Sequence, residues 1–425
     1  MKRRRTRDDE LVCSFCGRSS DEVPMLPGPD GNICVDCVRH ANEMVERHTR
    51  QSEAVPDLPP TPTPKEIKKF LDQYVIGHDE VKKVLAVAVH NHYRRLEATA
   101  AARKGKERKA APAGYAGYDD VEIEKSNILL IGPTGCGKTL LAKTLAKMLG
   151  VPFAIGDATV LTQAGYVGED VENLVRYLLQ NADGDVALAQ RGIIYVDEID
   201  KIASKTDNVS ITRDVGGEGV QQTLLKIVEG TICRIPPKGG RKHPDQEYIE
   251  VDTSNILFIC GGAFVGLDRI VAARKGRGVV GFGAAERREA EAGAAEVNPQ
   301  DVRPEDLVKY GLIPEFTGRL PVITTMKDLS EEDLVRVLTE PKNSLVKQYR
   351  KLLAMDGVSL EFEPAALRSL AKAALSRGTG ARGLRAEMER LMTDIMYEAP
   401  GSDSMREVKV TAEMVENPSA AKAAG

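Results

Sequence analysis

Residues 132–139 have the types and spacing of a phosphate-binding loop. They read Gly-Pro-Thr-Gly-Cys-Gly-Lys-Thr, which fits the pattern G-x-x-x-x-G-K-[ST]. Glycines let successive backbone N–H groups turn toward phosphate oxygens, and the N-terminus of a following helix adds a positive dipole end. We expect Lys138 to reach the β- and γ-phosphates and the Thr139 hydroxyl to bind Mg²⁺. The sequence therefore predicts a nucleotide site.

Two adjacent carboxylates, Asp197 and Glu198, follow the apolar run 193–196. Asp197 is placed to hold Mg²⁺, and Glu198 is placed to polarise an attacking water, which hydrolysis requires and simple binding does not. Asp-Glu pairs are common, so a strand that merely ends in a polar turn is the alternative. Because this pair ends an apolar strand downstream of Lys138, the pattern favours an ATPase.

Four of the seven cysteines are grouped as two C-x-x-C pairs, Cys13 with Cys16 and Cys34 with Cys37, separated by 17 residues. In a reducing compartment this spacing favours one tetrathiolate Zn²⁺ site over disulfides. A redox C-x-x-C is the competing reading, but it does not need a second copy. Four sulfur ligands close the tetrahedral shell, so we predict a structural zinc ion.

The elements that must position these residues follow an α/β pattern. The runs 127–131, 192–196 and 255–260 are short, apolar and rich in β-branched residues, and they alternate with helical segments. This pattern predicts buried strands of a parallel sheet with crossover helices. Upstream, Thr63, Pro64 and Glu66 have the spacing of a helix start with a capping box.

After residue 327 the sequence becomes mostly helical and predicts a separate, smaller domain. We expect helices at 331–353, 364–377 and 383–397, with strands at 358–362 and 406–411. Residues 101–119 and 274–304 are predicted to be insertions. The predicted domains are a zinc-binding domain at 1–48, a proline-rich linker at 49–63, a large ATPase domain at 64–326 and a small lid domain at 327–425.

Composition limits the classes of partner. The net charge is −4, from 59 basic and 63 acidic residues, so no global field favours nucleic acid. The absence of Trp and an aromatic content of 4% weaken any base-stacking role. No 18-residue apolar run exists and no apolar h-region follows the basic start, so we expect a cytoplasmic protein without a membrane partner.

Beyond these local patterns, the run 197–202 together with the phosphate loop resembles the AAA+ ATPases. An ordered series of further segments resembles one branch of them, the Clp family of protein unfoldases, along nearly the whole chain. These segments are the four-cysteine module and residues 74–77, 165–168, 214–222, 241–243, 280–282, 311–319 and 380–385. The expected fold is therefore α/β, with an AAA+ P-loop large domain, a mostly helical C-terminal lid domain and an N-terminal zinc-binding domain.

The resemblance implies a shared nucleotide site. Arg319 matches the family's arginine finger, which reaches the γ-phosphate of a neighbouring subunit, and Arg382 matches its sensor arginine. An arginine supplied in trans implies a ring, which is a homohexamer in this family. The implied catalytic residues are Asp197, Glu198, Arg319 and Arg382. The implied ATP-binding residues are Val75, Ile76, Gly132, Pro133, Thr134, Gly135, Cys136, Gly137, Lys138, Thr139 and Leu140, with Thr139 and Asp197 on Mg²⁺.

The resemblance also implies contacts with protein partners. Tyr166 and Val167 resemble a pore loop that grips polypeptide, and Arg241, Lys242 and His243 resemble a basic loop at the pore entrance that attracts degradation tags. Val280, Gly281 and Phe282 resemble the tripeptide that docks on a separate peptidase ring. The zinc module matches a domain that dimerises and recruits substrates and adaptors.

We find no protease site of the chain's own, and two alternatives to a peptidase-coupled unfoldase stay open. One is a zinc-bearing AAA+ remodeller of nucleic acids, and the other is a chaperone that never meets a peptidase. A further expectation concerns Cys136, where the relatives usually have Ser. A helix N-terminus can lower the pKa of its thiol, so we expect nucleotide binding to be sensitive to thiol oxidation.

Overall fold

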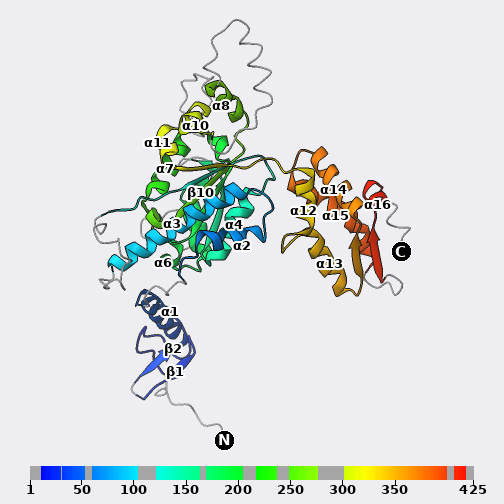
Figure 1. Ribbon diagram of the computed structural model, residues 1–425. Coiled ribbons are helices and arrows are strands. Elements are labelled where there is room, and N and C mark those ends of the chain that lie inside the picture. Colours follow the sequence, from blue (N-terminus) through cyan, green and yellow to red (C-terminus); the bar gives the residue numbers. More distant parts are fainter. Residues whose placement is uncertain are drawn as a thin grey trace. The chain divides into compact units, whose positions relative to one another are not determined.

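The computed structural model of the chain describes residues 11–29, 31–52, 60–103, 121–162, 169–203, 217–236, 248–275, 301–399 and 406–417. The chain divides into two compact units, Met1–Pro59 and Pro60–Gly425, with the elements shown in Figure 1. Among the described helices, none is both long and apolar enough to cross a bilayer.

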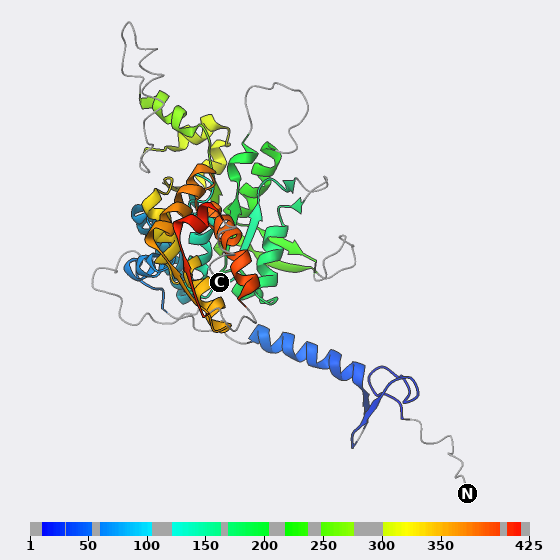
Figure 2. The ribbon, with the colours of Figure 1, turned by 90° about the vertical axis from the view of Figure 1, so that its right-hand side faces the viewer.

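The first unit is a small hairpin followed by a helix. Strands β1 (Met25–Pro27) and β2 (Asn32–Cys34) pair antiparallel, and α1 (Val35–Ser52) begins directly after β2. Figure 2 shows α1 as one continuous helix leading away from the hairpin. Among the side chains described in this unit, only Cys13 and Cys34 are buried. The unit therefore has almost no apolar core of its own.

The second unit is built on a five-stranded parallel sheet with the strand order β11-β3-β10-β7-β4. The strands are β3 (Ile128–Ile131), β4 (Phe153–Asp157), β7 (Ile193–Asp197), β10 (Leu257–Gly262) and β11 (Val322–Thr325). The predicted parallel α/β sheet is confirmed. The strand predicted at 255–260 begins two residues later, because η2 (Thr253–Asn255) forms a 3₁₀ turn before it.

Successive side chains of a strand point to opposite faces of the sheet, and both faces of this sheet are apolar. Leu129 and Ile131 of β3 join one core, whereas Ile128 and Leu130 join the other. Helices α2 (Pro64–Asp72), α3 (Asp79–Arg103) and α4 (Lys138–Leu149) cover the second face, and Figure 1 shows α3 and α4 lying across the sheet. Helices α5 (Asn173–Asn181) and α7 (Glu218–Glu229) cover the first face.

The start of α2 follows the predicted capping box. The Thr63 hydroxyl accepts from the N–H of Glu66, the Glu66 carboxylate accepts from the N–H of Thr63, and Pro64 takes the first helical position. The remaining elements of the large part are β5 (Leu161–Thr162), β6 (Glu169–Asp170), α6 (Val186–Ala189), η1 (Ile199–Ile202), β8 (Ile232–Ile235), β9 (Ile249–Asp252), α8 (Leu267–Lys275), α10 (Pro304–Tyr310) and α11 (Pro314–Gly318).

The C-terminal region has a core of its own, formed by apolar residues from Leu329 to Val415. Its elements are α12 (Glu331–Thr339), α13 (Leu345–Met355), β12 (Ser359–Phe362), α14 (Pro364–Ser376), α15 (Ala381–Glu398), β13 (Glu407–Val410) and α16 (Ala412–Glu416). The two predicted strands pair in parallel. The prediction of a single helix at 331–353 is wrong. The helix is interrupted around Pro341, because a proline ring does not fit a helix interior, and α12 and α13 form instead.

A buried ion pair holds the ends of the segment between α8 and α10. The Asp306 side chain is fully buried and accepts from Arg274 Nε at 2.9 Å and from the N–H of Arg303 at 2.9 Å. Burial alone would raise the pKa of Asp306, but Arg274 and the Arg303 N–H outweigh it and hold this pKa below its usual range. Because the pKa of Asp306 is lower in the folded state than in the unfolded state, where it is near 4, its ionisation stabilises the fold at pH values above about 4. This stabilisation is lost as the pH falls through the folded-state pKa.

We therefore expect Asp306→Asn to lower the melting temperature of the Pro60–Gly425 unit by about 5 °C at pH 7. The difference from wild type should shrink as the pH is lowered toward 3. A matched control is Glu389→Gln, which removes one partner of the exposed pair between Arg385 and Glu389 and should change the melting temperature little. If Asp306→Asn lowers the melting temperature by the same amount at every pH, the ion pair is not the cause of the loss.

Candidate nucleotide and zinc sites

The phosphate loop connects the carboxyl end of β3 to the start of α4. Gly135 and Gly137 have φ angles of +84° and +105°, which side chains other than glycine adopt with strain. A Cβ at Gly135 would stand 2.3 Å from the carbonyl oxygen of Thr379. Helix α4 has no side-chain cap at Gly137. The N-cap residue thus supplies no acceptor to the first N–H groups of the helix, and phosphate oxygens can take that place.

Lys138 is directed into this loop. Its side chain is largely buried, and its Nζ donates to the carbonyl oxygens of Gly132 at 2.6 Å and Pro133 at 3.0 Å. Among the described residues, the hydrogen-bond partners of this largely buried ammonium are neutral carbonyls, which makes it a strong donor for a phosphate oxygen. The residues of the loop therefore fit the phosphates of a nucleotide.

The carboxyl end of β7 brings Asp197 to the start of α4. The Thr139 hydroxyl donates to Asp197 Oδ2 at 3.1 Å, while Asp197 Oδ1 accepts from the Tyr195 hydroxyl at 3.1 Å and from the N–H of Glu198 at 3.0 Å. A hydroxyl and a carboxylate oxygen in contact are hard donors that suit Mg²⁺. The structure thus brings the two predicted magnesium ligands together.

Glu198 follows Asp197 at the same edge of the sheet. It has φ +56°, in the left-handed region that non-glycine residues seldom adopt, and its side chain is exposed. Such a backbone conformation is common at active sites, where it is maintained by the surrounding structure. Glu198 is therefore adjacent to the predicted magnesium ligands and open to solvent, which is the setting that a water-activating carboxylate needs.

Val75 and Ile76 lie in the connection between α2 and α3 and are buried. Val75 Cγ1 stands 4.0 Å from where a Cβ of Gly137 would be, so this connection borders the phosphate loop. The neighbouring His78 has φ +57°, and its buried Nε2 has no hydrogen-bond partner among the described residues. Burial lowers the pKa of His78, and a hydrogen bond with the Cys136 backbone opposes this shift.

Arg382 is the second residue of α15 and is exposed. The N–H of the preceding Ala381 donates to the carbonyl oxygen of Gly135 at 3.2 Å, so the start of α15 contacts the phosphate loop. The C-terminal region thus closes one side of the site, and Arg382 lies next to it.

Arg319 lies at the other edge of the sheet. Its carbonyl oxygen accepts from Asn127 Nδ2 at 3.0 Å, and Asn127 directly precedes β3, whereas the phosphate loop follows β3. The Arg319 side chain is paired with Glu229 at 2.8 Å. The structure therefore does not bring Arg319 together with Asp197 and Glu198 of the same chain.

Cys136 does not have the environment that we expected. Its side chain is buried, and its thiol donates to Met326 Sδ at 3.8 Å. Burial raises the pKa of this thiol, which keeps it protonated and less reactive. The expectation that the helix N-terminus lowers this pKa is wrong, because loss of solvent dominates.

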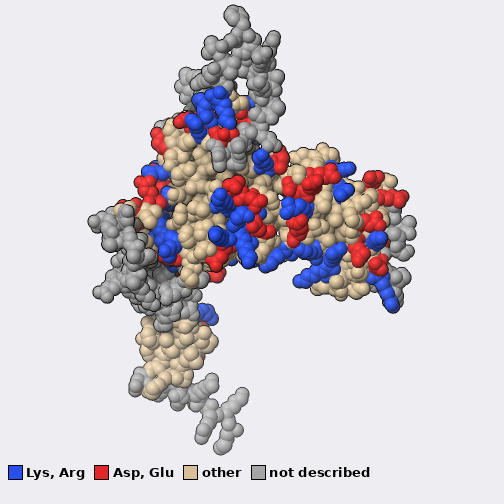
Figure 3. Space-filling view, viewed as in Figure 1, with Lys and Arg blue, Asp and Glu red and all other residues tan. Residues whose placement is uncertain are grey.

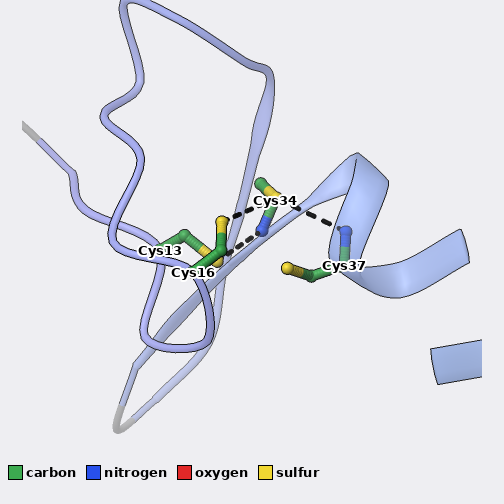
Figure 4. A group of neighbouring side chains, drawn as sticks. All are labelled: Cys13, Cys16, Cys34 and Cys37. Carbon is green, nitrogen blue, oxygen red and sulfur yellow. Dashed lines mark hydrogen bonds between the residues drawn. The ribbon is translucent and has the colours of Figure 1, made fainter. Parts of the chain in front are cut away.

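The four cysteines of the first unit converge, as Figure 4 shows. Their sulfur atoms all lie within 4.8 Å of one another. Burial opposes ionisation of Cys13, but hydrogen bonds from backbone groups, including the N–H of Cys34 at 3.3 Å, lower its pKa to about 6. The pKa of Cys16 is lowered as well, chiefly by a hydrogen bond with the Arg18 backbone, so four clustered sulfurs, two of them favoured as thiolate, fit a tetrahedral Zn²⁺ ion.

The predicted loops for protein partners lie outside the described residues. These are Tyr166 and Val167, the basic loop Arg241, Lys242 and His243, and the tripeptide Val280, Gly281 and Phe282. The greater parts of the predicted insertions at 101–119 and 274–304 lie there too. These assignments stay predictions.

Tyr195 is the site residue that sequence reasoning missed. Its hydroxyl contacts Asp197, yet the sequence presents it as one more apolar residue of a buried strand. The available signal was the period of two along β7, which puts Tyr195 and Asp197 on one face of the sheet, toward α4.

Three stretches of the chain match known families. Residues 123–323 match the AAA domain (Cdc48 subfamily), residues 11–47 match the ClpX C4-type zinc finger, and residues 329–412 match the C-terminal, D2-small domain, of ClpB protein. Together with the parallel sheet and the phosphate loop, the first match indicates an ATPase with an AAA domain. With the zinc finger and the small domain on the same chain, the three matches together indicate a ClpX-like AAA+ protein, an ATPase of the chaperone type.

Proposed function

We propose that the chain is an ATP-driven protein unfoldase and translocase that works as a homohexameric ring and delivers tagged substrates to the ClpP peptidase. The observation that carries the proposal is the ClpX C4-type zinc finger on the same chain as the AAA domain. Bound ATP, with Mg²⁺, supplies the driving force through phosphoryl transfer to water. The chain's own residues bind the phosphates, hold the metal and orient the water.

The position of Arg319 supports the proposal of a ring. Its backbone carbonyl is held by Asn127 at the amino edge of the sheet, and its guanidinium pairs with Glu229 and not with a residue of the phosphate loop. A guanidinium remains charged and can grip phosphate bidentately, which suits a finger supplied to a neighbouring subunit. The pair with Glu229 is solvent-exposed on both sides, so it costs little to exchange for a phosphate of that neighbour.

The contact between α15 and the phosphate loop supports coupling of hydrolysis to motion. Ala381 and Gly135 join the C-terminal region to the nucleotide site by one backbone hydrogen bond. Arg382, the next residue along α15, would bind the γ-phosphate of ATP and so couple hydrolysis to a change in the angle between the two parts. Tyr166 and Val167 transmit that motion to the polypeptide, and Phe282 with Val280 docks on ClpP. The zinc module recruits substrates and adaptors, and we place the assembly in the cytoplasm.

A zinc-bearing remodeller of nucleic acids is the alternative from another class. Figure 3 shows basic and acidic side chains interspersed over the face that it draws, which agrees with the net charge of −4. Nucleic-acid binding requires a basic surface that releases counterions. The net charge and the mixed charges on this face therefore favour a protein substrate over nucleic acid.

The test is the response of the ATPase to added polymers. Wild-type chain should hydrolyse ATP faster in the presence of an unfolded, tagged polypeptide and should not respond to single- or double-stranded DNA. A parallel assay with a folded, untagged protein measures the dependence on the tag. Stimulation by DNA with no response to polypeptide would reject the unfoldase in favour of the remodeller.

A further inference from the structure

Tyr195 is fully buried in the core between the sheet and α4, yet its polar end reaches the nucleotide site. The residue lies on the same face of β7 as Asp197, and its hydroxyl donates to Asp197 Oδ1 at 3.1 Å. A phenol carries one hydrogen, so this bond uses its whole capacity as a donor. The core of the large part thus ends in a hydrogen bond to a predicted magnesium ligand.

The neighbouring strand is adapted to this hydroxyl. A Cβ at Gly261 of β10 would stand 2.1 Å from the Tyr195 hydroxyl oxygen and 2.8 Å from the ring carbon that bears it. Any side chain at this position would displace the phenol. The carboxyl end of β10 therefore presents no side chain at Gly261, and the polar group at this point of the sheet comes from Tyr195 of β7.

The two oxygens of the Asp197 carboxylate have different hydrogen-bond partners. A carboxylate offers about four lone pairs, two on each oxygen. The Tyr195 hydroxyl and the N–H of Glu198 use those of Oδ1, whereas Oδ2 accepts only from Thr139 at 3.1 Å among the described contacts. Oδ2 therefore retains acceptor capacity on the side of Thr139, the other predicted magnesium ligand.

We propose that Tyr195 is a positioning residue for magnesium: its hydroxyl fixes the Asp197 carboxylate so that Oδ2 remains directed toward Thr139. The inference rests on the proposed ATPase site and names a group that acts on its metal through Asp197. Groups that orient a metal ligand typically contribute 10–100-fold to metal affinity. A ring that served packing alone would affect stability without any effect specific to magnesium.

The test compares Tyr195→Phe with Tyr93→Phe. Tyr93 is buried in the same core, and its hydroxyl donates to the Arg191 carbonyl at 2.9 Å, away from the phosphate loop. Both variants lose one buried phenolic hydrogen bond and keep the ring. Binding of a fluorescent, non-hydrolysable ATP analogue is measured in EDTA and then during titration with Mg²⁺, and ATPase is measured over the same Mg²⁺ range.

We expect equal affinities in EDTA for wild type and both variants. The Mg²⁺ concentration at the midpoint should rise about tenfold in Tyr195→Phe, in binding and in hydrolysis, and stay unchanged in Tyr93→Phe. Gly261→Ala keeps the hydroxyl but crowds it, so its midpoint should move in the same direction. Equal midpoints in Tyr195→Phe and Tyr93→Phe overturn the proposal. If wild type binds the analogue but hydrolyses no ATP, the ATPase assignment fails, and the binding titration still decides the role of Tyr195.

Discussion

Glu198→Gln should bind ATP with wild-type affinity and hydrolyse it about 10²–10⁴-fold more slowly. The amide has the shape of the carboxylate but cannot accept a proton from water. The side chain is exposed beside Asp197, so the substitution buries no new group, and the N–H that Glu198 donates to Asp197 Oδ1 belongs to the backbone and is kept. Steady-state phosphate release, together with equilibrium binding of a fluorescent nucleotide, measures both quantities.

The matched control is Glu361→Gln, which makes the same chemical change at an exposed position on β12 of the C-terminal region. Its hydrolysis rate and nucleotide affinity should equal those of wild type. If Glu198→Gln retains more than about a tenth of the wild-type rate, Glu198 is not the group that activates water. If it loses binding as well, its role is in nucleotide affinity.

Removal of zinc should unfold residues 11–52 and spare the ATPase. Structural zinc contributes about 10 kcal/mol or more to the folding of small four-ligand modules. Here the only buried side chains described in the first unit are two of the ligands, Cys13 and Cys34. Loss of the metal therefore leaves no apolar core to hold the hairpin on α1. All predicted nucleotide-binding residues belong to the Pro60–Gly425 unit.

Cys34→Ser removes one of the four predicted zinc ligands and so tests the role of the metal directly. We expect the variant to lose its zinc, to become sensitive to protease within residues 11–52 and to keep basal ATP hydrolysis. Cys136→Ser removes a thiol outside the cluster and should retain one zinc ion per chain. Zinc content and the positions of protease cleavage are the measurements. A protease-resistant N-terminal unit in metal-free Cys34→Ser would show that zinc does not hold this fold.

Much of the fold was predictable because local chemistry and tertiary structure agree. Apolar β-branched runs became the central strands β3, β7 and β10, and the capping residues Thr63 and Glu66 began α2. The errors came where one local feature outweighed a longer pattern. Pro341 divides an otherwise helical stretch, and the turn at Thr253–Asn255 delays β10.

The site was predictable only in part. The motifs predicted that Lys138, Thr139 and Asp197 lie together, because the carboxyl ends of parallel strands share one edge of the sheet. Spacing carries no information on burial, so it misjudged the Cys136 thiol. It also missed Tyr195, whose role depends on the missing side chain at Gly261 of another strand.

The most direct test of the central claim is the fluorescence of a folded, tagged reporter protein mixed with the wild-type chain and ATP. We predict that fluorescence is lost only with ATP, that Glu198→Gln does not cause this loss, and that peptides appear only when ClpP is added. A reporter that remains fluorescent while wild-type chain hydrolyses ATP at its stimulated rate would contradict the account of an ATP-driven unfoldase.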